Sequence, residues 1–133
     1  MSDNGLVTLR STHDFVKTLA RIEAALEARG ITVFARVDHA AGASGAGLFL
    51  RPTTLLLFGN PAAGTPLMQA AQTAGIDLPL KVLVWQDAGG TVNLTYNDPA
   101  WIAARHALGE EAQKPLAALA AGLQSLARQA TED

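Results

Sequence analysis

The amino-acid sequence predicts a single α+β domain, with a mostly antiparallel sheet and helices packed on one face of that sheet. Strand-like segments follow one another along most of the chain. Only one helical segment separates two strands at the length of a crossover connection, which disfavours a doubly wound parallel sheet. The chain has 133 residues, of which 49% are hydrophobic, so it has the size of one domain and enough apolar residues for a core.

The N-terminal part is predicted to form a strand at Leu6–Arg10 and then a helix. Apolar residues recur at helical spacing from Phe15 to Leu26, and charged residues occupy the opposite face. Ser11 or Thr12 is expected to cap the start of this helix. Gly30 is expected to end it, because glycine adopts a positive φ without steric cost.

The next strand is predicted over Ile31–Val37, whose alternation places every second residue on one face. The Gly-rich segment Ala40–Gly47 fits either a mobile loop or a short helix, and its composition leaves both open. An extended run over Leu48–Phe58 contains Pro52. A short helix is then expected to begin at Thr65-Pro66, because proline is favoured in the first turn.

The second half is predicted to contain a β-hairpin and two helices. Lys81–Gln86 and Thr91–Tyr96 are the hairpin strands, since a Gly-rich turn joins them. Asp98-Pro99 is expected to start a helix, and Leu116–Leu126 places leucines in one apolar stripe of the last helix, which we interpret as packing within the chain. The predicted order is β-α-β-β-(short α)-β-β-α-α in one domain of residues 1–133, with flexible tails at 1–5 and 131–133.

Charge and composition exclude several classes of function. The net charge is −2 and no run of Lys or Arg occurs, which argues against binding to nucleic acid or to an anionic membrane surface. No cysteine is present, so disulfides and thiol chemistry are excluded. No apolar stretch approaches the roughly 18 residues of a membrane span, so we expect a soluble, cytoplasmic protein. No cofactor is predicted, and no metal, because the spacings of zinc sites are missing.

The segment Arg51–Thr65 (RPTTLLLFGNPAAGT) is the first candidate site. An apolar strand ends there at Gly59-Asn60-Pro61, and a helix is predicted to follow. Backbone N–H groups at the start of a helix can hold an anion, and Gly64 would allow close approach. In the alternative interpretation Asn60 only shapes the turn and Thr65 only caps the helix.

Asp38-His39 is the second candidate, as an acid–base pair at the end of a strand. The alternative, which we favour, is that Asp38 caps the Gly-rich segment and His39 has a structural role. Arg51 is predicted either to bind a carboxylate ligand or to form a structural ion pair with Asp38 or Asp77.

A set of short motifs spreads over most of the chain and comprises Asp38-His39, Arg51-Pro52-Thr53, Phe58-Gly59-Asn60-Pro61, Gly64-Thr65, Asp77-Leu78-Pro79-Leu80 and Tyr96. In this order they resemble the bacterial family catalogued as domain of unknown function 302, from about Leu6 to Leu126. The resemblance implies a small α+β domain similar to TATA-binding-protein-like folds, often found as a homodimer, with no established activity. Members often carry a Lys directly after FGNP, where this chain has Ala62.

These observations lead to three hypotheses. The first is a homodimeric module that binds a small molecule or an anion at a polar site near the FGNP turn, formed by Arg51, Asn60, Gly64 and Thr65. The second is an enzyme that acts on a small metabolite, with His39 as general base. The third is a purely structural or interaction role, in which the motifs serve only the fold and the dimer contact.

Overall fold

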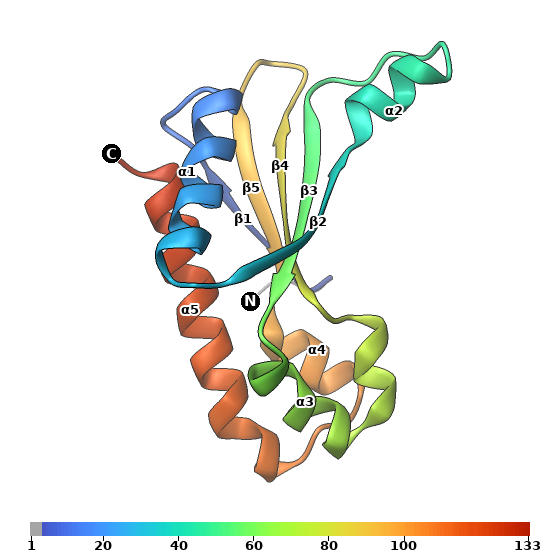
Figure 1. Ribbon diagram of the computed structural model, residues 1–133, viewed down its shortest axis with the longest axis vertical. Coiled ribbons are helices and arrows are strands. Elements are labelled where there is room, and N and C mark those ends of the chain that lie inside the picture. Colours follow the sequence, from blue (N-terminus) through green and yellow to red (C-terminus); the bar gives the residue numbers. More distant parts are fainter. Residues whose placement is uncertain (1–3) are drawn as a thin grey trace.

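The structure of the protein is a computed structural model that describes residues 4–133, and within this range five strands form one sheet. The sheet has the order β1-β5-β4-β3-β2, and every neighbouring pair is antiparallel. The strands are β1 (Leu6–Arg10), β2 (Thr32–Asp38), β3 (Thr53–Gly59), β4 (Leu80–Gln86) and β5 (Val92–Asn97). The predicted α+β class with an antiparallel sheet is confirmed (Figure 1).

Two long helices cover one face of the sheet, and the main core lies between them and the strands. They are α1 (Phe15–Ala28) and α5 (Gln113–Thr131). Apolar side chains at helical spacing, such as Ile22, Leu26 and Leu123, are buried against Leu56 and Phe58 of β3. The leucine stripe of the last helix therefore packs within the chain, as its spacing predicts.

Two short helices and two 3₁₀ turns gather beyond one end of the sheet, below it in Figure 1. They are α3 (Pro61–Ala70), the 3₁₀ turns η1 (Gln72–Ile76) and η2 (Glu110–Ala112), and α4 (Pro99–Arg105). A second, smaller apolar cluster holds them to α5, with Leu67, Ala74, Ala112 and Leu116 buried at its centre. This group of helices places the turn after β3 beside the start of β4.

The Gly-rich segment forms a helix, α2 (His39–Gly45), that projects from the other end of the sheet (Figure 1). None of its residues is buried. Asp38 caps it, since the Asp38 Oδ1 accepts a hydrogen bond of 2.9 Å from the Ala41 N–H. We call residues 39–50, which comprise α2 and the segment that returns to the sheet, the arm.

Local signals predicted several helix boundaries, but not all of them. Gly30 follows the end of α1 with φ +67°, as expected. The cap of α1 is Asp14 rather than Ser11 or Thr12, because the Asp14 carboxylate accepts a hydrogen bond from the Lys17 N–H at 2.7 Å. Helix α4 begins after its cap Asp98, as predicted.

The strand β2 departs from regular alternation. Its register against β3 shifts between Val33 and Ala35, which leaves Phe34 as an extra residue. Val33 and Ala35 therefore do not share a face, although strict alternation predicts that they do. All seven residues of β2 are exposed, and among the described strands β2 pairs only with β3.

Two residues of the predicted flexible tails, Gly5 and Thr131, are held in place. Residues 1–3 lie outside the described part of the chain. Gly5 is buried, and its carbonyl accepts a hydrogen bond of 2.8 Å from the Asp98 N–H. Thr131 is also buried, and its carbonyl accepts from the Thr12 N–H at 2.8 Å. These contacts hold both segments to neighbouring elements.

Candidate functional site

A cavity of about 520 Å³ lies where β3 and β4 meet the helices beyond the sheet. This volume is within the roughly 300–1,000 Å³ that is usual for small-molecule sites. Five segments contribute to its wall: the edge strand β2, the end of β3, the FGNP turn with α3, residues 78–80 at the entrance to β4, and α5. The lining residues are Phe34, Leu57, Gly59, Asn60, Pro61, Ala63, Gly64, Thr65, Met68, Leu78, Pro79, Leu80 and Leu119.

The FGNP turn positions one wall of this cavity. Strand β3 ends at Gly59, and the Asn60 Oδ1 accepts a hydrogen bond of 2.9 Å from the Ala62 N–H, so Asn60 caps α3 and Pro61 is its first residue. The helix therefore begins before Thr65, and the predicted start at Thr65-Pro66 is wrong. Pro66 lies inside α3 instead.

The start of α3 does not offer the free donors of an anion site. Pro61 has no N–H. The Ala62 N–H is taken by the Asn60 side chain, and the N–H groups of Ala63 and Gly64 both donate to the Asn60 carbonyl, at 2.9 and 3.1 Å. No Lys or Arg is among the lining residues. The cavity is lined mainly by apolar groups, and the occupied N–H groups favour the alternative interpretation, in which Asn60 only shapes the turn.

The structure separates the residues that the sequence grouped into one polar site. Asn60, Gly64 and Thr65 line the cavity, after the last residue of β3. Arg51 precedes the first residue of β3, at its opposite end. Because a strand rises about 3.3 Å per residue, the two ends of β3 lie about 20 Å apart. Arg51 is therefore not part of the cavity, and the predicted grouping is wrong.

Asp38 and His39 also lie at the far end of β3, since Asp38 pairs with Thr54. The Asp38 carboxylate caps α2, which confirms the structural interpretation of this residue. His39 is exposed in the first turn of α2 and does not line the cavity. Arg51 forms no ion pair within residues 4–133.

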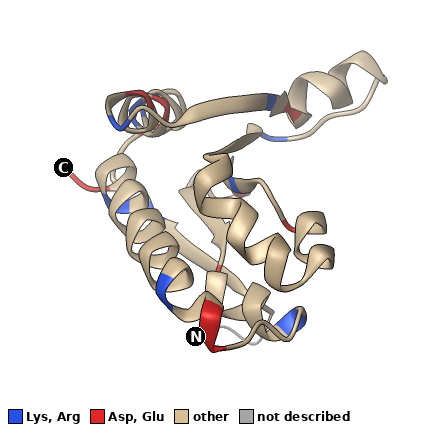
Figure 2. Cartoon of the chain, turned by 60° about the horizontal axis from the view of Figure 1, so that its bottom comes forward, with Lys and Arg blue, Asp and Glu red and all other residues tan. Residues whose placement is uncertain are grey.

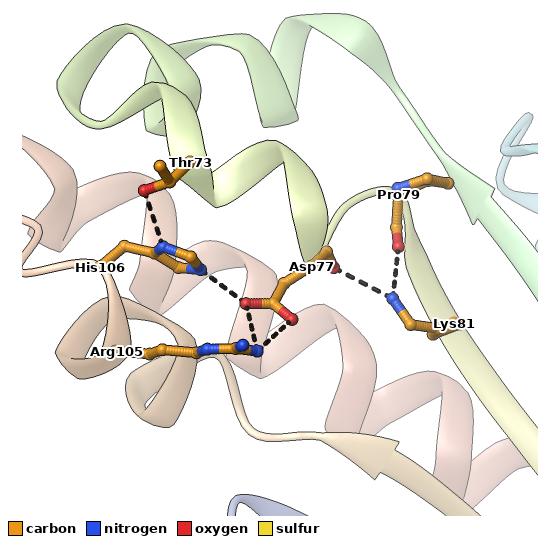
Figure 3. Close-up of polar contacts among 6 residues, drawn as sticks. All are labelled: Thr73, Asp77, Pro79, Lys81, Arg105 and His106. Atoms are coloured by element: carbon orange, nitrogen blue, oxygen red, sulfur yellow. Dashed lines mark hydrogen bonds and ion pairs between the residues drawn. The ribbon is translucent and has the colours of Figure 1, made fainter.

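A polar cluster that the sequence did not predict lies among the helices beyond the sheet (Figure 3). The Asp77 Oδ2 lies 2.6 Å from the His106 Nε2, and the His106 Nδ1 lies 3.0 Å from the Thr73 Oγ1. The Arg105 Nη1 donates to both oxygens of Asp77, at 3.0 and 3.3 Å. The His106 side chain is only 6% exposed and that of Asp77 15%. The cluster ties η1 to the end of α4.

This cluster combines a hydroxyl, an imidazole and a carboxylate, which is the order of groups in many nucleophilic sites. Neither Thr73 nor Asp77 lines the cavity, however, and the Asp77 carboxylate is also held by Arg105. We therefore assign the cluster a structural role. Within the described residues, no group of three or more His, Asp or Glu side chains is arranged to hold a metal ion.

Lys81 lies next to this cluster and is the second residue of β4. Its Nζ donates to the carbonyls of Asp77 and Pro79, at 3.1 and 3.3 Å. Burial lowers the pKa of Lys81, and the nearby Asp77 carboxylate partly opposes this effect. Since Pro79 lines the cavity, Lys81 supports the segment that forms the cavity wall.

Comparison with known proteins identifies the family. A family model described as "Domain of unknown function DUF302" matches residues 7–126. The chain belongs to this family. A crystal structure of an uncharacterized conserved protein DUF302 from Bacillus stearothermophilus is similar, with a TM-score of 0.83 over 95% of this chain and 98% of that one. Its sequence identity is 20%, so this likeness supports the fold alone.

Curated relatives share more sequence with this DUF302 chain. It is 47% identical over 131 residues to proteins named Fluoride-specific ion channel FluC 1 from Brucella suis and from Brucella abortus. The match covers 98% of this chain but only 52% and 48% of those proteins, so the chain spans about half their length. None of the helices within residues 4–133 is long and apolar enough to cross a membrane.

Proposed function

We propose that this DUF302 domain is a homodimeric module that binds a small, largely apolar molecule in the cavity beside the FGNP turn. One observation carries the proposal: the turn that defines much of the sequence resemblance forms the wall of a cavity of about 520 Å³. Apolar pockets of this size with a few polar groups are the usual form of small-molecule sites.

The lining residues define the chemistry of the ligand. Leu57, Met68 and Leu119 are among the apolar side chains that line the cavity, and they favour a hydrocarbon or aromatic body. Asn60 and Thr65 are the polar side chains of the wall, and they suit one uncharged hydrogen-bonding group on the ligand. A charged ligand is disfavoured, because burying an ion without a partner is costly.

Binding of the neutral apolar dye N-phenyl-1-naphthylamine tests this proposal. With the unmodified chain we expect a saturable increase in dye fluorescence. For Gly64→Leu we expect the affinity for the dye to fall by about tenfold or more. A Cβ atom at Gly64 would lie 3.7 Å from Leu78 Cδ1, so one carbon fits but a longer side chain takes cavity space.

Gly122→Leu is the matched control, because it makes the same change in α5 where no atom lies within 4 Å of the added Cβ. Equal dye binding by the unmodified chain and both variants would contradict a ligand site in the cavity. It would favour the purely structural hypothesis for the FGNP motif.

Exposed apolar side chains support the homodimer. The open face of the sheet, which α1 and α5 do not cover, carries the half-buried side chains of Leu55, Leu83 and Trp85. Phe34 is 53% exposed on the edge strand, and Phe49 is 85% exposed on the arm. Exposed large apolar side chains of this kind are common at protein interfaces. Sedimentation velocity should therefore show a dimer.

The curated relatives support a second candidate, a domain that acts together with a fluoride channel. The match covers nearly all of this chain and about half of each Brucella protein. In this proposal the other half of those proteins forms the channel, and this domain binds to it. Adding the purified chain to vesicles that contain the unmatched half of the Brucella suis protein should change the rate of fluoride release. An unchanged rate, with no co-sedimentation of the chain, would contradict the proposal.

A further inference from the structure

The edge strand β2 and the arm form one continuous uncovered surface. Within residues 4–133, strand β2 pairs with β3 on one side only, and no strand pairs with the backbone groups on its other side. The arm continues directly from β2 and exposes three consecutive apolar residues, Leu48 at 69%, Phe49 at 85% and Leu50 at 41%. Exposed neighbouring apolar residues beside a free strand edge indicate a surface that a partner covers.

The arm has the composition of a segment that packs into an apolar site. Residues 39–50 contain no Lys, Arg, Asp or Glu, and Figure 2 shows α2 without any such residue. The cavity wall contains none either. Removing either surface from water therefore leaves no unpaired charge, and burial of Phe49 is favourable.

The cavity reaches the same strand edge. Phe34 is the extra residue of the β2 irregularity, and it also lines the cavity. Thr32, near Phe34, pairs with Gly59 at the FGNP turn, whereas Asp38 at the other end of β2 leads into the arm. The cavity and the arm thus lie at opposite ends of one free strand.

A two-fold axis through the middle of β2 brings these two features together. If two copies pair antiparallel along β2, Thr32 of one copy faces Asp38 of the other. The arm of each copy then extends past the FGNP turn of its partner. Helix α2 has seven residues, so at about 1.5 Å per residue it reaches roughly 10 Å beyond the paired strands, along the first part of α3.

We propose that the arm of a second copy of this chain closes the cavity, with Phe49 of that copy against the wall formed by Phe34 and α3. This proposal rests on the homodimer of the proposed function and specifies how the partner completes the ligand site. The contact occurs twice and is related by symmetry, so it produces a closed dimer rather than a filament. A ligand would then be bound between residues of both copies.

Cross-linking tests this arrangement directly, because the natural chain contains no cysteine. Phe49→Cys and Ala63→Cys are made as separate proteins, one of them with a mass tag, then mixed and treated with a short bis-maleimide. Phe49 is exposed and Ala63 lies on the cavity wall, so both changes preserve the core. We expect the mixed product, Cys at 49 joined to Cys at 63, to predominate on a denaturing gel.

Each protein carries a single cysteine, so a link between positions 49 and 63 always joins two copies of the chain. A product dominated by links between two copies of the Phe49→Cys protein would overturn the proposal, since it would mean that the arms meet each other. A monomer by sedimentation velocity would overturn both this proposal and the homodimer. Dye binding by that monomer would still support the ligand site, so the two failures are distinguishable.

Dimer affinity provides a second measurement. Phe49→Ser should raise the dimer Kd about tenfold or more, as loss of a buried aromatic anchor does. Val16→Ser is the matched control, because Val16 is 75% exposed on α1 and lies outside the proposed contact. Equal Kd values for both variants would overturn the role of Phe49.

Discussion

A capped helix begins beside each end of strand β3, but the two helices produce different surfaces. Helix α3 follows β3 itself, whereas α2 follows β2, whose last residue pairs with Thr54. At one end Asn60 caps α3, and at the other Asp38 caps α2, each through a hydrogen bond of 2.9 Å to a backbone N–H two or three residues ahead. Helix α3 buries Leu67 and forms one wall of an apolar cavity. Helix α2 buries no residue and projects from the sheet.

This difference shows that a cap sets the residue at which a helix starts, whereas packing determines whether the helix is held against the domain. A helix of seven residues gains little stability by itself. Helix α3 is held by the second apolar cluster. Helix α2 has no such support within residues 4–133, so it depends on whatever surface covers the arm. The following predictions compare matched changes at the two ends.

Replacing one phenylalanine by alanine at each end should give the largest difference in the free energy of unfolding. Phe58 is 1% exposed in the main core, and Phe58→Ala should lower the free energy of unfolding by about 3–5 kcal/mol. Phe49→Ala on the arm should change the free energy of unfolding of the monomer by less than about 0.5 kcal/mol. Urea denaturation at low protein concentration measures both values. A comparable loss in the two variants would mean that the arm packs on its own domain.

Breaking the polar cluster below the cavity should have the next largest effect. Asp77→Ala removes the acceptor of His106, which is 6% exposed, and of Arg105. Leaving such a donor unpaired costs about 1–3 kcal/mol. The control Glu23→Ala breaks the exposed ion pair with Arg36 and should cost less than about 1 kcal/mol. Chemical denaturation compares them, and equal losses would show that the cluster does not stabilise this end.

The fold was predictable because its signals are local. The periodicity from Phe15 to Leu26 and the Gly-rich turn between β4 and β5 require only neighbouring residues, and both elements are present. The start of α3 was not predictable in this way. Asn60-Pro61 and Thr65-Pro66 are equally good starting pairs, and the earlier one is used, which lets α3 bury Leu67.

The candidate site was only partly predictable, because strand geometry and long-range contacts define it. The sequence pointed to the turn at Asn60, and this turn lies in the wall of the cavity. Arg51 is only nine positions from Asn60 along the chain. Because the extended strand β3 lies between them, the two residues are at opposite ends of the sheet. Asp77 and His106 are 29 positions apart, and no spacing in the sequence indicates that they meet.

Removing the two helix caps, Asn60 and Asp38, should produce a smaller difference in the free energy of unfolding than the changes above. Asn60→Ala should lower the free energy of unfolding by about 1 kcal/mol, because α3 is part of the packed structure. Asp38→Ala should leave the global value unchanged and increase hydrogen exchange only in α2, since this helix opens by itself. Denaturation and hydrogen exchange measure the pair. A global loss in Asp38→Ala would contradict the independence of the arm.

The pH dependence of stability should show the smallest effect, and it reports on Lys81 at the cavity end. Burial lowers the pKa of Lys81 below its usual value of 10.5, so the folded chain releases this proton at a lower pH than the unfolded chain does. In the window between the two pKa values the unfolded state binds more protons, and stability therefore rises with pH until about 10.5.

Lys81→Met should remove this rise, whereas Lys17→Met, at an exposed position of α1, should retain it. The pKa of Tyr96 is raised, chiefly by burial, and its contribution runs in the opposite direction above its usual value of 10.0. Because both variants keep Tyr96, the difference between their urea midpoints from pH 8 to pH 10.5 isolates the contribution of Lys81. Parallel plots of urea midpoint against pH for the two variants would contradict this prediction. They would show that the Lys81 ammonium, which donates to the carbonyls of Asp77 and Pro79, is as well solvated in the folded domain as in the unfolded chain.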